Sequence, residues 1–354
     1  MIAWYPRWRM LVPLLICMMP LYATAAPAAT PLAPRVLIIT MFDGEARPWL
    51  AHAGLDRHIT VPGLASRYPA VRCRADATLC MLTTDMGYAN AASSVTALML
   101  SPWFDLRRSY VIVAGIGGID PAYGTLGSAH WARYVVDGGL NYTLDPRQVP
   151  ADWNSGIVAL GAARPGTPGD WHAGTELFQL DEALLQRAYA LSRAVPLADS
   201  EEARRYRARY SAAPGNAPPQ VSICDTLSSD TYWHGSRMAA AMATQVAVVS
   251  NGKARVCTTQ MEDNATLTAL TRGAEAGRID LRRVALLRTG SNFDREAPGQ
   301  SVAESLHAKS GGFVPATTNA YRVANALAQA IIGDWSQWRE GVPAAAAAAI
   351  TADR

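Results

Sequence analysis

Charged residues are scarce in this chain of 354 residues, because Asp, Glu, Lys and Arg together make up only 17% of it. The formal net charge is +3, and two of the positive charges, Arg7 and Arg9, lie in the first ten residues, which contain no acidic residue. The rest of the chain is therefore close to neutral, and it has no basic stripe. Such a charge pattern lacks the electrostatic signature of a nucleic-acid-binding surface, so we expect no nucleic-acid partner.

Long apolar runs are also missing. The run over residues 10–22 is interrupted by two prolines, and the run over 238–249 contains Thr244 and Gln245, so both are too short to cross a bilayer comfortably. The first run follows two arginines and precedes the small-residue sequence Ala-Thr-Ala at 23–25, which is the pattern of a secretory signal peptide. We predict a signal peptide over residues 1–25, no transmembrane span in the mature chain, and a periplasmic or secreted location.

Cysteine and histidine are few, and neither forms a metal-binding motif. Of the five cysteines, Cys17 would leave with the signal peptide, and an even count of four in an exported chain indicates disulfides. We favour the pairs Cys73–Cys80 and Cys224–Cys257 among the three possible pairings, with buried free thiols as the alternative. The six histidines are scattered and form no HExxH, so we expect no metal ion. We also expect no organic cofactor.

Continuous apolar runs with β-branched residues are present, and they predict buried strands. The runs lie at 35–42, 77–87 and 109–118, and a helix-like segment at 90–101 with a cap candidate at Asn90 lies between the last two. Strand, glycine turn, helix and strand in this order predict an α/β fold with a largely parallel or mixed sheet. A further strand is predicted at 283–294 and helices at 176–194 and 319–335, followed by an Ala-rich tail at 343–354. We expect residues 26–342 to form a single domain.

Polar residues gather where these predicted strands end. The five segments FDGEARPW, TTDMGYANAA, AGIGGIDP, TTQMEDN and RTGSNFD each follow an apolar run. Ligands of open α/β sheets bind beyond the carboxyl ends of the strands, so this pattern predicts a small-molecule pocket. Two interpretations remain open for Glu262 in the fourth segment. It either begins a helix, where carboxylates interact well with the helix dipole, or projects into the pocket and binds hydroxyl groups.

The same segments resemble the nucleoside phosphorylase and nucleosidase superfamily, whose members cleave the N-glycosidic bond of nucleosides on a three-layer α/β/α fold. TTDMGYANAA is similar to its Gly-x-Gly-x-x-Asn-Ala-Ala turn, although Asp85 replaces the first glycine. VIVAGIGGIDP, TTQMEDNA and LLRTGSNFD resemble its glycine-rich, Met-Glu and Arg-x-x-Ser-Asp segments. More narrowly, MFDGEARPW, GIGGIDP, SSDTYWHGS, TTQMEDNATL and LRTGSNFD resemble the family named purine nucleoside permeases.

The resemblance implies a purine nucleoside as ligand and assigns roles to individual residues. Glu262 would accept hydrogen bonds from the ribose hydroxyls and Met261 would pack against the sugar, while Asp263 and Asn264 are interpreted as helix-start residues. The substrate-binding set that it implies is Gly87, Gly117, Gly118, Tyr232, Trp233, His234, Met261, Glu262 and Ser291. In this set the aromatic rings would stack on the purine and His234 would bond the 5′-hydroxyl, with a lid packed on the core as the alternative.

The catalytic residues implied by the resemblance are Glu45, Asn292 and Asp294. Glu45 matches the glutamate that activates water in related nucleosidases. Asn292 replaces the usual acid, and an amide can bond the purine at N7 and O6 but cannot donate a proton. Three alternatives remain open: Asn292 favours 6-oxopurines, Asp294 acts as the acid in its place, or the protein does not catalyse the reaction.

Water and phosphate remain open as nucleophiles. Phosphorolysis needs a cationic anchor, and the glycine-rich segment has no arginine beside it, which leaves Arg47 as the nearby candidate. We therefore favour hydrolysis, with phosphate as a co-substrate only in the alternative. A non-catalytic nucleoside-binding protein that assists transport is the second function class. The superfamily usually assembles into oligomers, so a homo-oligomer is a further expectation.

Overall fold

The computed structural model describes residues 30–344. The predicted signal peptide and nearly all of the Ala-rich tail therefore lie outside the described residues. The strands are β1 Val36–Thr40, β2 Arg57–Thr60, β3 Ala70–Cys73, β4 Leu79–Thr83, β5 Tyr110–Ile119, β6 Ala129–Trp131, β7 Tyr134–Asp137, β8 Asn141–Thr143, β9 Ile157–Ala159, β10 Leu177–Gln179, β11 Val221–Ile223, β12 Asp225–Ser228, β13 Val256–Gln260 and β14 Val284–Phe293. The helices are α1 Asp43–His52, α2 Tyr88–Leu100, α3 Glu182–Ser192, α4 Glu201–Arg207, α5 Ser236–Val249, α6 Asp263–Glu275, the 3-10 turn η1 Leu281–Arg283, α7 Val302–Leu306, α8 Phe313–Gly333 and α9 Trp335–Trp338.

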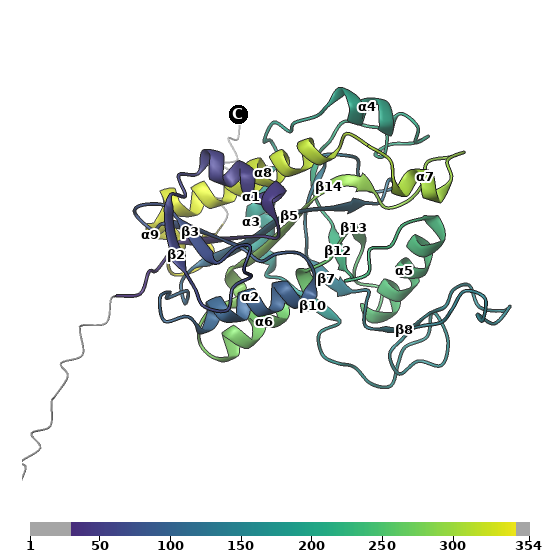
Figure 1. Ribbon diagram of the computed structural model, residues 1–354, viewed down its shortest axis with the longest axis horizontal. Helices are drawn as coiled ribbons and strands as arrows, with labels where there is room; N and C mark the ends of the chain where they lie inside the picture. Colours follow the sequence, from purple (N-terminus) through teal and green to yellow (C-terminus); the bar gives the residue numbers. More distant parts are fainter. Residues whose placement is uncertain (1–29, 345–354) are drawn as a thin grey trace, which may run out of the picture. The chain divides into compact units, whose positions relative to one another are not determined.

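A mixed sheet forms the middle layer (Figure 1). Its main path runs β10-β7-β12-β13-β5-β1-β4-β3-β2, and β14 pairs in parallel with β5 along nearly its whole length. The centre is parallel, because β1 pairs in parallel with both β4 and β5. Successive residues of β1 enter different cores: Val36 and Ile38 pack on one face, and Leu37 and Ile39 pack on the other.

Helices cover both faces of this sheet, which makes a three-layer α/β/α arrangement. Helices α1, α3, α8 and α9 pack on one face, and α2 and α6 pack on the opposite face (Figure 1). Helix α5 covers the β12–β7 end of the sheet, where Met242 and Val246 meet Val136 and Leu227. No helix within residues 30–344 is both long and apolar enough to cross a membrane.

Strand β5 changes its partner halfway along, and this change positions the site. Its first half pairs with β1 at Val36–Ile39, while its end, at Gly118 and Ile119, pairs with β13 in the antiparallel direction. The ends of β1 and β13 therefore meet beside the same stretch of β5. Residues that follow β1 and β13 come together there although they are more than 200 positions apart in the sequence.

Several predicted elements have different bounds in the structure. The glycine-rich end of the strand predicted at 109–118 extends to Ile119 as the second half of β5, and its glycines leave room for β13. Helix α2 begins after Gly87 rather than at Asn90, whose side chain bonds Met86 O from within the helix. The predicted helix at 176–194 splits into β10 and α3, since the side chain of Asp181 caps the helix at Leu184 N.

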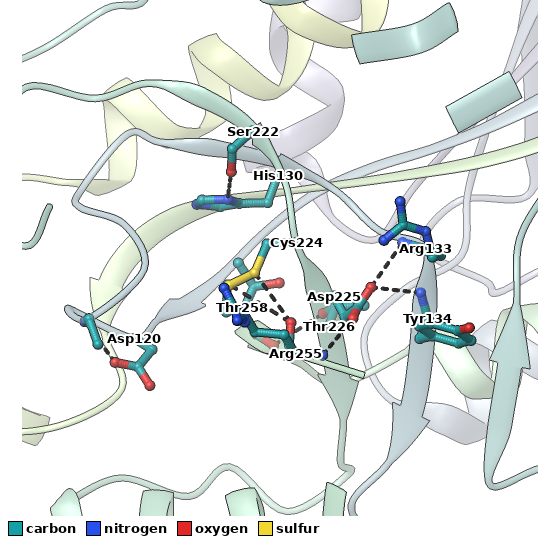
Figure 2. Close-up of a disulfide and its surroundings, with 12 residues drawn as sticks. Asp120, His130, Arg133, Tyr134, Ser222, Cys224, Asp225, Thr226, Arg255 and Thr258 are labelled. Carbon is teal, nitrogen blue, oxygen red and sulfur yellow. Dashed lines mark hydrogen bonds between the residues drawn. A yellow bond between two sulfur atoms is a disulfide. The ribbon is translucent and has the colours of Figure 1, made fainter. Parts of the chain in front are cut away.

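Both predicted disulfides are present. Cys73 and Cys80 are cross-strand partners on β3 and β4, with Cα atoms 4.0 Å apart. Cys224 lies at the break between β11 and β12 and joins Cys257 of β13, with Cα atoms 5.8 Å apart. Figure 2 shows this second disulfide beside Asp225, whose carboxylate accepts backbone N–H groups across the same break.

Candidate functional site

A cavity of about 310 Å³ opens where β1, β5, β13 and β14 converge, a volume in the range of small-molecule sites. Strand ends and the segment before α5 supply its walls. The lining residues are Met41, Phe42, Glu45, Met86, Ile116, Gly117, Gly118, Ser229, Thr231, Tyr232, Trp233, Thr259, Gln260, Met261, Glu262, Arg288, Ser291, Asn292 and Asp294. The structure thus brings most of the sequence-predicted site residues to one cavity.

Glu262 both begins a helix and lines the cavity, so the two interpretations that the sequence left open do not exclude each other. It occupies the N-cap position of α6, yet its side chain makes no capping hydrogen bond. The carboxylate turns to the cavity wall, where it accepts N–H bonds from Gly87 at 3.2 Å and Met261 at 3.3 Å. Gly87 has a φ of +88°, and it bonds this carboxylate without lining the cavity itself. Its role is to hold Glu262 rather than to touch a ligand.

The turn before α2 also explains the departure at Asp85. Asp85 adopts a φ of +67°, which lies in the left-handed region that favours glycine and that aspartate tolerates better than most residues. Its side chain accepts the N–H of Met86 at 2.9 Å, which stabilises the turn. Asp85 therefore preserves the backbone conformation that a glycine would provide.

Arg288 of β14 lines the cavity, and the sequence reasoning matched it to the arginine of the Arg-x-x-Ser-Asp segment but assigned it no role. It is 1% exposed, and its guanidinium bonds both carboxylate oxygens of Asp263, Glu262 Oε2 at 3.3 Å and the carbonyl of Ile116 at 2.9 Å. These bonds use four of its five N–H donors: one on Nε, one on Nη1 and two on Nη2. An arginine inside the apolar run ALLRTG was the sequence signal, because a buried cation requires acidic partners.

Asp263 was interpreted as a helix-start residue, and that interpretation was incomplete. It is the first residue of α6, but it is fully buried and pairs with Arg288 through both oxygens. Asn264 likewise begins the helix and is held by Ser228 and by the carbonyl of Thr175. Both side chains therefore fix α6 against the sheet and thereby fix the position of Glu262.

Glu45 enters the cavity from the first turn of α1. Its two oxygens accept N–H bonds from Met41 at 2.7 Å and Ile116 at 2.8 Å, and Arg288 Nη1 lies 4.0 Å away. The side chain is 2% exposed, and burial raises the pKa of this carboxyl from 4.5 to about 7, against the opposing charge of Arg288. A carboxyl that titrates near neutral pH and faces a cavity can exchange a proton with a bound water.

The charges around Arg288 do not balance, and the cavity is negative. Glu45, Glu262 and Asp263 all face this one guanidinium, and burial raises the pKa of all three carboxyls. Among the described residues that line the cavity, Arg288 is the only cation. Arg47, the anion anchor considered from the sequence, is exposed on α1 and does not line it.

Gly117 and Gly118 line the cavity, but their lack of a side chain serves packing. A Cβ on Gly117 would lie 2.5 Å from Thr259 O, and a Cβ on Gly118 would lie 2.9 Å from Thr259 Oγ1. Real Cβ atoms do not approach that closely, so β13 can cross against β5 only at glycine. Gly115 has a similar role, since a Cβ there would lie 2.7 Å from Glu45 Oε1.

Another part of the cavity wall is formed by Ser291, Asn292 and Tyr232. Asn292 Nδ2 donates to the Tyr232 hydroxyl and to Phe293 O, both at 3.0 Å, while Ser291 Oγ donates to Gly117 O at 3.1 Å. Tyr232 remains 56% exposed at the rim of the cavity. The amide of Asn292 is thereby fixed in the wall of the cavity that Glu262 also lines.

Asp294 lines the same wall but is committed to an ion pair. Its oxygens lie 2.7 Å and 2.9 Å from the guanidinium of Arg295, which also pairs with Asp120. Burial raises the pKa of Asp294 to about 6 despite this arginine. Asp120 additionally accepts the N–H of Ala122, which stabilises the turn after β5.

His234 is not brought into the cavity, in contrast to Trp233 beside it. The imidazole of His234 does not line the cavity, and neither ring nitrogen has a hydrogen-bond partner within residues 30–344. Burial lowers its pKa. A direct bond from His234 to a ligand in this cavity is therefore not part of the site described here.

Replacing Glu45 with Gln should change how stability depends on pH. The folded-state pKa of Glu45 is raised, so the folded protein binds its proton more tightly than the unfolded chain does. Its contribution to stability is full below pH 4.5 and is lost as the pH rises to about 7. We expect wild type, relative to Glu45→Gln, to lose up to about 1.4 kcal/mol per pH unit in that window. Urea unfolding of both proteins from pH 4 to 8 measures this, and parallel curves would contradict the raised pKa.

Comparison with known sequences identifies relatives of this chain. Residues 33–343 match the family model described as "Purine nucleoside permease (NUP)". The purine nucleoside permease of Candida albicans is 37% identical over 310 residues, covering 86% of this chain and 76% of that protein. The probable purine nucleoside permease of Schizosaccharomyces pombe is 37% identical over 317 residues, covering 86% and 91%.

Comparison with solved structures identifies the fold. The 5′-methylthioadenosine/S-adenosylhomocysteine nucleosidase from Neisseria meningitidis superposes with a TM-score of 0.51 at 14% identity, covering 84% of this chain and 99% of that one. Futalosine hydrolase of Helicobacter pylori superposes with a TM-score of 0.50 at 12% identity, covering 84% and 98%. The predicted nucleoside phosphorylase-like α/β fold is thus confirmed.

Proposed function

The chain belongs to the purine nucleoside permease family, and from this membership we propose that it binds purine nucleosides and hydrolyses their N-glycosidic bond. The observation that carries the proposal is the pair formed by Glu45 and Glu262, which face one cavity and share Arg288. The signal-peptide pattern and the two disulfides support an exported protein that assists nucleoside uptake. Nucleosidases among its structural neighbours agree in fold with this activity.

Glu262 would hold the ribose. Its carboxylate lies at the cavity wall beside Met261, and burial strengthens a charge-assisted bond to a hydroxyl. Arg288 and the N–H groups of Gly87 and Met261 fix the carboxylate before the ligand arrives. A pre-positioned acceptor of this kind orients the sugar without further ordering cost.

Glu45 would act as the general base for water. The oxygen of the water bonds to C1′ as the C1′–N9 bond breaks, and Glu45 takes the proton of that water. The base leaves with the electron pair of the broken C1′–N9 bond and takes up a proton from solvent, and Glu45 then returns its own proton to solvent. The negative cavity stabilises the positive charge that develops on the sugar in such a transition state.

The same charge pattern disfavours phosphate as the nucleophile. A phosphate dianion needs cationic or N–H donors, and four of the five donors of Arg288 are already used. The remaining N–H belongs to Nη1, which lies 4.0 Å from Glu45 Oε1. Hydrolysis therefore fits this site better than phosphorolysis.

Asn292 would bind the base by donating an amide hydrogen, which in the free protein bonds the Tyr232 hydroxyl, to N7 or to a 6-oxo group. It lines the same cavity as Glu262 and lies near the end of β14. It cannot donate a proton, and Asp294 is held by Arg295 through both oxygens. This lack of a free acid favours the second candidate function, a nucleoside-binding protein without catalysis.

The decisive experiment incubates the mature protein with inosine, guanosine and adenosine, with and without phosphate. Release of free base and ribose without phosphate supports hydrolysis. Release of ribose 1-phosphate only with phosphate reassigns the reaction to phosphorolysis. Binding without release in either condition leaves the non-catalytic function.

Replacing Glu262 with Gln should weaken nucleoside binding while the fold persists, because the amide keeps the shape but removes the charged acceptor. We expect a loss of about 1.5–3 kcal/mol in binding free energy by calorimetric titration. Glu275→Gln, at the exposed end of the same helix, is the matched control and should bind as wild type does. Wild-type affinity in Glu262→Gln would remove this residue from the ligand site.

Replacing Asn292 with Asp should shift the preference among nucleosides toward adenosine. A protonated aspartate can donate to N7, and the change removes the amide partner of a 6-oxo group. The ratio of binding constants for adenosine and inosine, measured for both proteins, tests this. Ser222→Ala, whose hydroxyl bonds His130 away from the cavity, is a control that should leave the ratio unchanged.

A further inference from the structure

A second cavity, of about 400 Å³, lies directly beside the first. The two share the side chains of Trp233, Thr259 and Asp294 in their walls. Helix α5 and the end of β13 enclose the second cavity, and the disulfide partner Cys257 belongs to its wall. A ligand that fills the first cavity therefore contacts side chains that also line the second cavity.

The charge of the second cavity is opposite to that of the first. Its wall contains the cations Lys253, Arg255 and Arg295 and the carboxylates of Asp120 and Asp294. Arg295 pairs with both carboxylates, at 2.6 Å and 2.7 Å, and the three cations of the wall exceed its two carboxylates by one charge.

The other two cations are available to a ligand. Within residues 30–344 neither Lys253 nor Arg255 forms a salt bridge, and the guanidinium of Arg255 lies over the ring of Tyr123 at 5.6 Å. Figure 2 shows Arg255 beside the Cys224 disulfide, with its backbone held by Asp225. The net effect is a positive cavity adjoining a negative one.

An apolar wall faces these cations. Leu227 of β12 and Met242 and Val246 of α5 line the same space. A carbon chain that ends in an anion matches this combination, since the chain would contact the apolar side chains and the anion would reach the cations. A bare inorganic anion would leave the apolar wall without a partner.

In the proposed function, a bound nucleoside is oriented so that the 6-position of its purine points towards the second cavity. With the ribose at Glu262, the N7 and 6-position edge of the purine faces Asn292. Asp294, two residues further along the chain, belongs to both cavities. We propose that the second cavity receives an acidic substituent on the 6-position of the purine, so that 6-modified nucleosides bearing a carboxylate are preferred ligands. This inference rests on the proposed function and specifies its substrate class.

The test compares three ligands by calorimetric titration: adenosine, adenosine carrying a carboxyethyl group on its 6-amino nitrogen, and the neutral carbamoylethyl analogue. Wild type should bind the acid about three- to tenfold more tightly than the amide, because both cations are exposed and such pairs are individually weak. The double variant Lys253→Gln/Arg255→Gln should lose that preference and keep its affinity for adenosine. The double variant Arg272→Gln/Lys309→Gln removes two exposed cations that line neither cavity, and it should retain the preference.

The outcomes separate this inference from the proposed function. If adenosine binds but the acid binds no better than the amide, the inference is overturned while nucleoside binding stands. If the preference survives in Lys253→Gln/Arg255→Gln, the carboxylate is bound elsewhere and the inference is equally overturned. Failure of all three ligands to bind contradicts the proposed function, and the inference falls with it.

Discussion

Turnover should fall by a factor on the order of 10²–10⁴ when Glu45 is replaced by Gln, while nucleosides still bind. The amide keeps the volume of the side chain, and its single oxygen can still accept one of the two N–H bonds that Met41 and Ile116 donate to Glu45. It cannot take a proton from water, so only the chemical step is lost. Single-turnover measurements with inosine, with phosphate omitted, report that step directly.

The control for this variant is Asp43→Asn, which removes an exposed carboxylate from the same helix turn. It should turn over at the wild-type rate. The wild-type rate should also decline as the pH falls below about 7, since protonated Glu45 is no longer a base. Unchanged turnover in Glu45→Gln, or a wild-type rate that does not change between pH 5 and 8, would show that Glu45 is not the base.

Removing Arg288 should cause the largest loss of stability. Arg288→Met leaves Glu45, Glu262 and Asp263 facing one another in a buried space without a cation. Breaking a buried ion pair by deleting one partner typically costs about 3–5 kcal/mol, because the charge left behind is uncompensated. Urea unfolding at pH 8 should show a loss of that size in the free energy of unfolding.

The loss should be smaller at pH 5 than at pH 8, since carboxyls that take up protons no longer need the cation. Arg272→Met, which removes an exposed arginine of α6, is the control and should change stability by less than about 0.5 kcal/mol. An equal loss at both pH values would show that Arg288 stabilises through packing alone. A loss below about 1 kcal/mol would contradict the central role of the ion-pair cluster.

Local patterns in the sequence determined the fold class. Strand β1 and the first half of β5 are continuous apolar runs because both faces of the sheet are covered by helices, and such runs are readable without any tertiary information. The paired cysteines were readable for a similar reason, since an even count and strand-like surroundings restrict the pairings. Motif resemblance added the identity of Glu45, Glu262 and Asn292 as candidate site residues.

Tertiary structure alone decided which of these residues act together. Arg288 lies in an apolar run that predicts only a strand, and its partners Glu45 and Asp263 are 243 and 25 positions away in the sequence. Likewise the reason for glycine at positions 117 and 118 becomes visible only in the structure, where β13 packs across them. The physical reason is that ion pairing and close packing depend on distance in space, whereas sequence patterns report only the periodicity and burial of one segment at a time. The partner switch of β5, which creates the cavity, has no local signature.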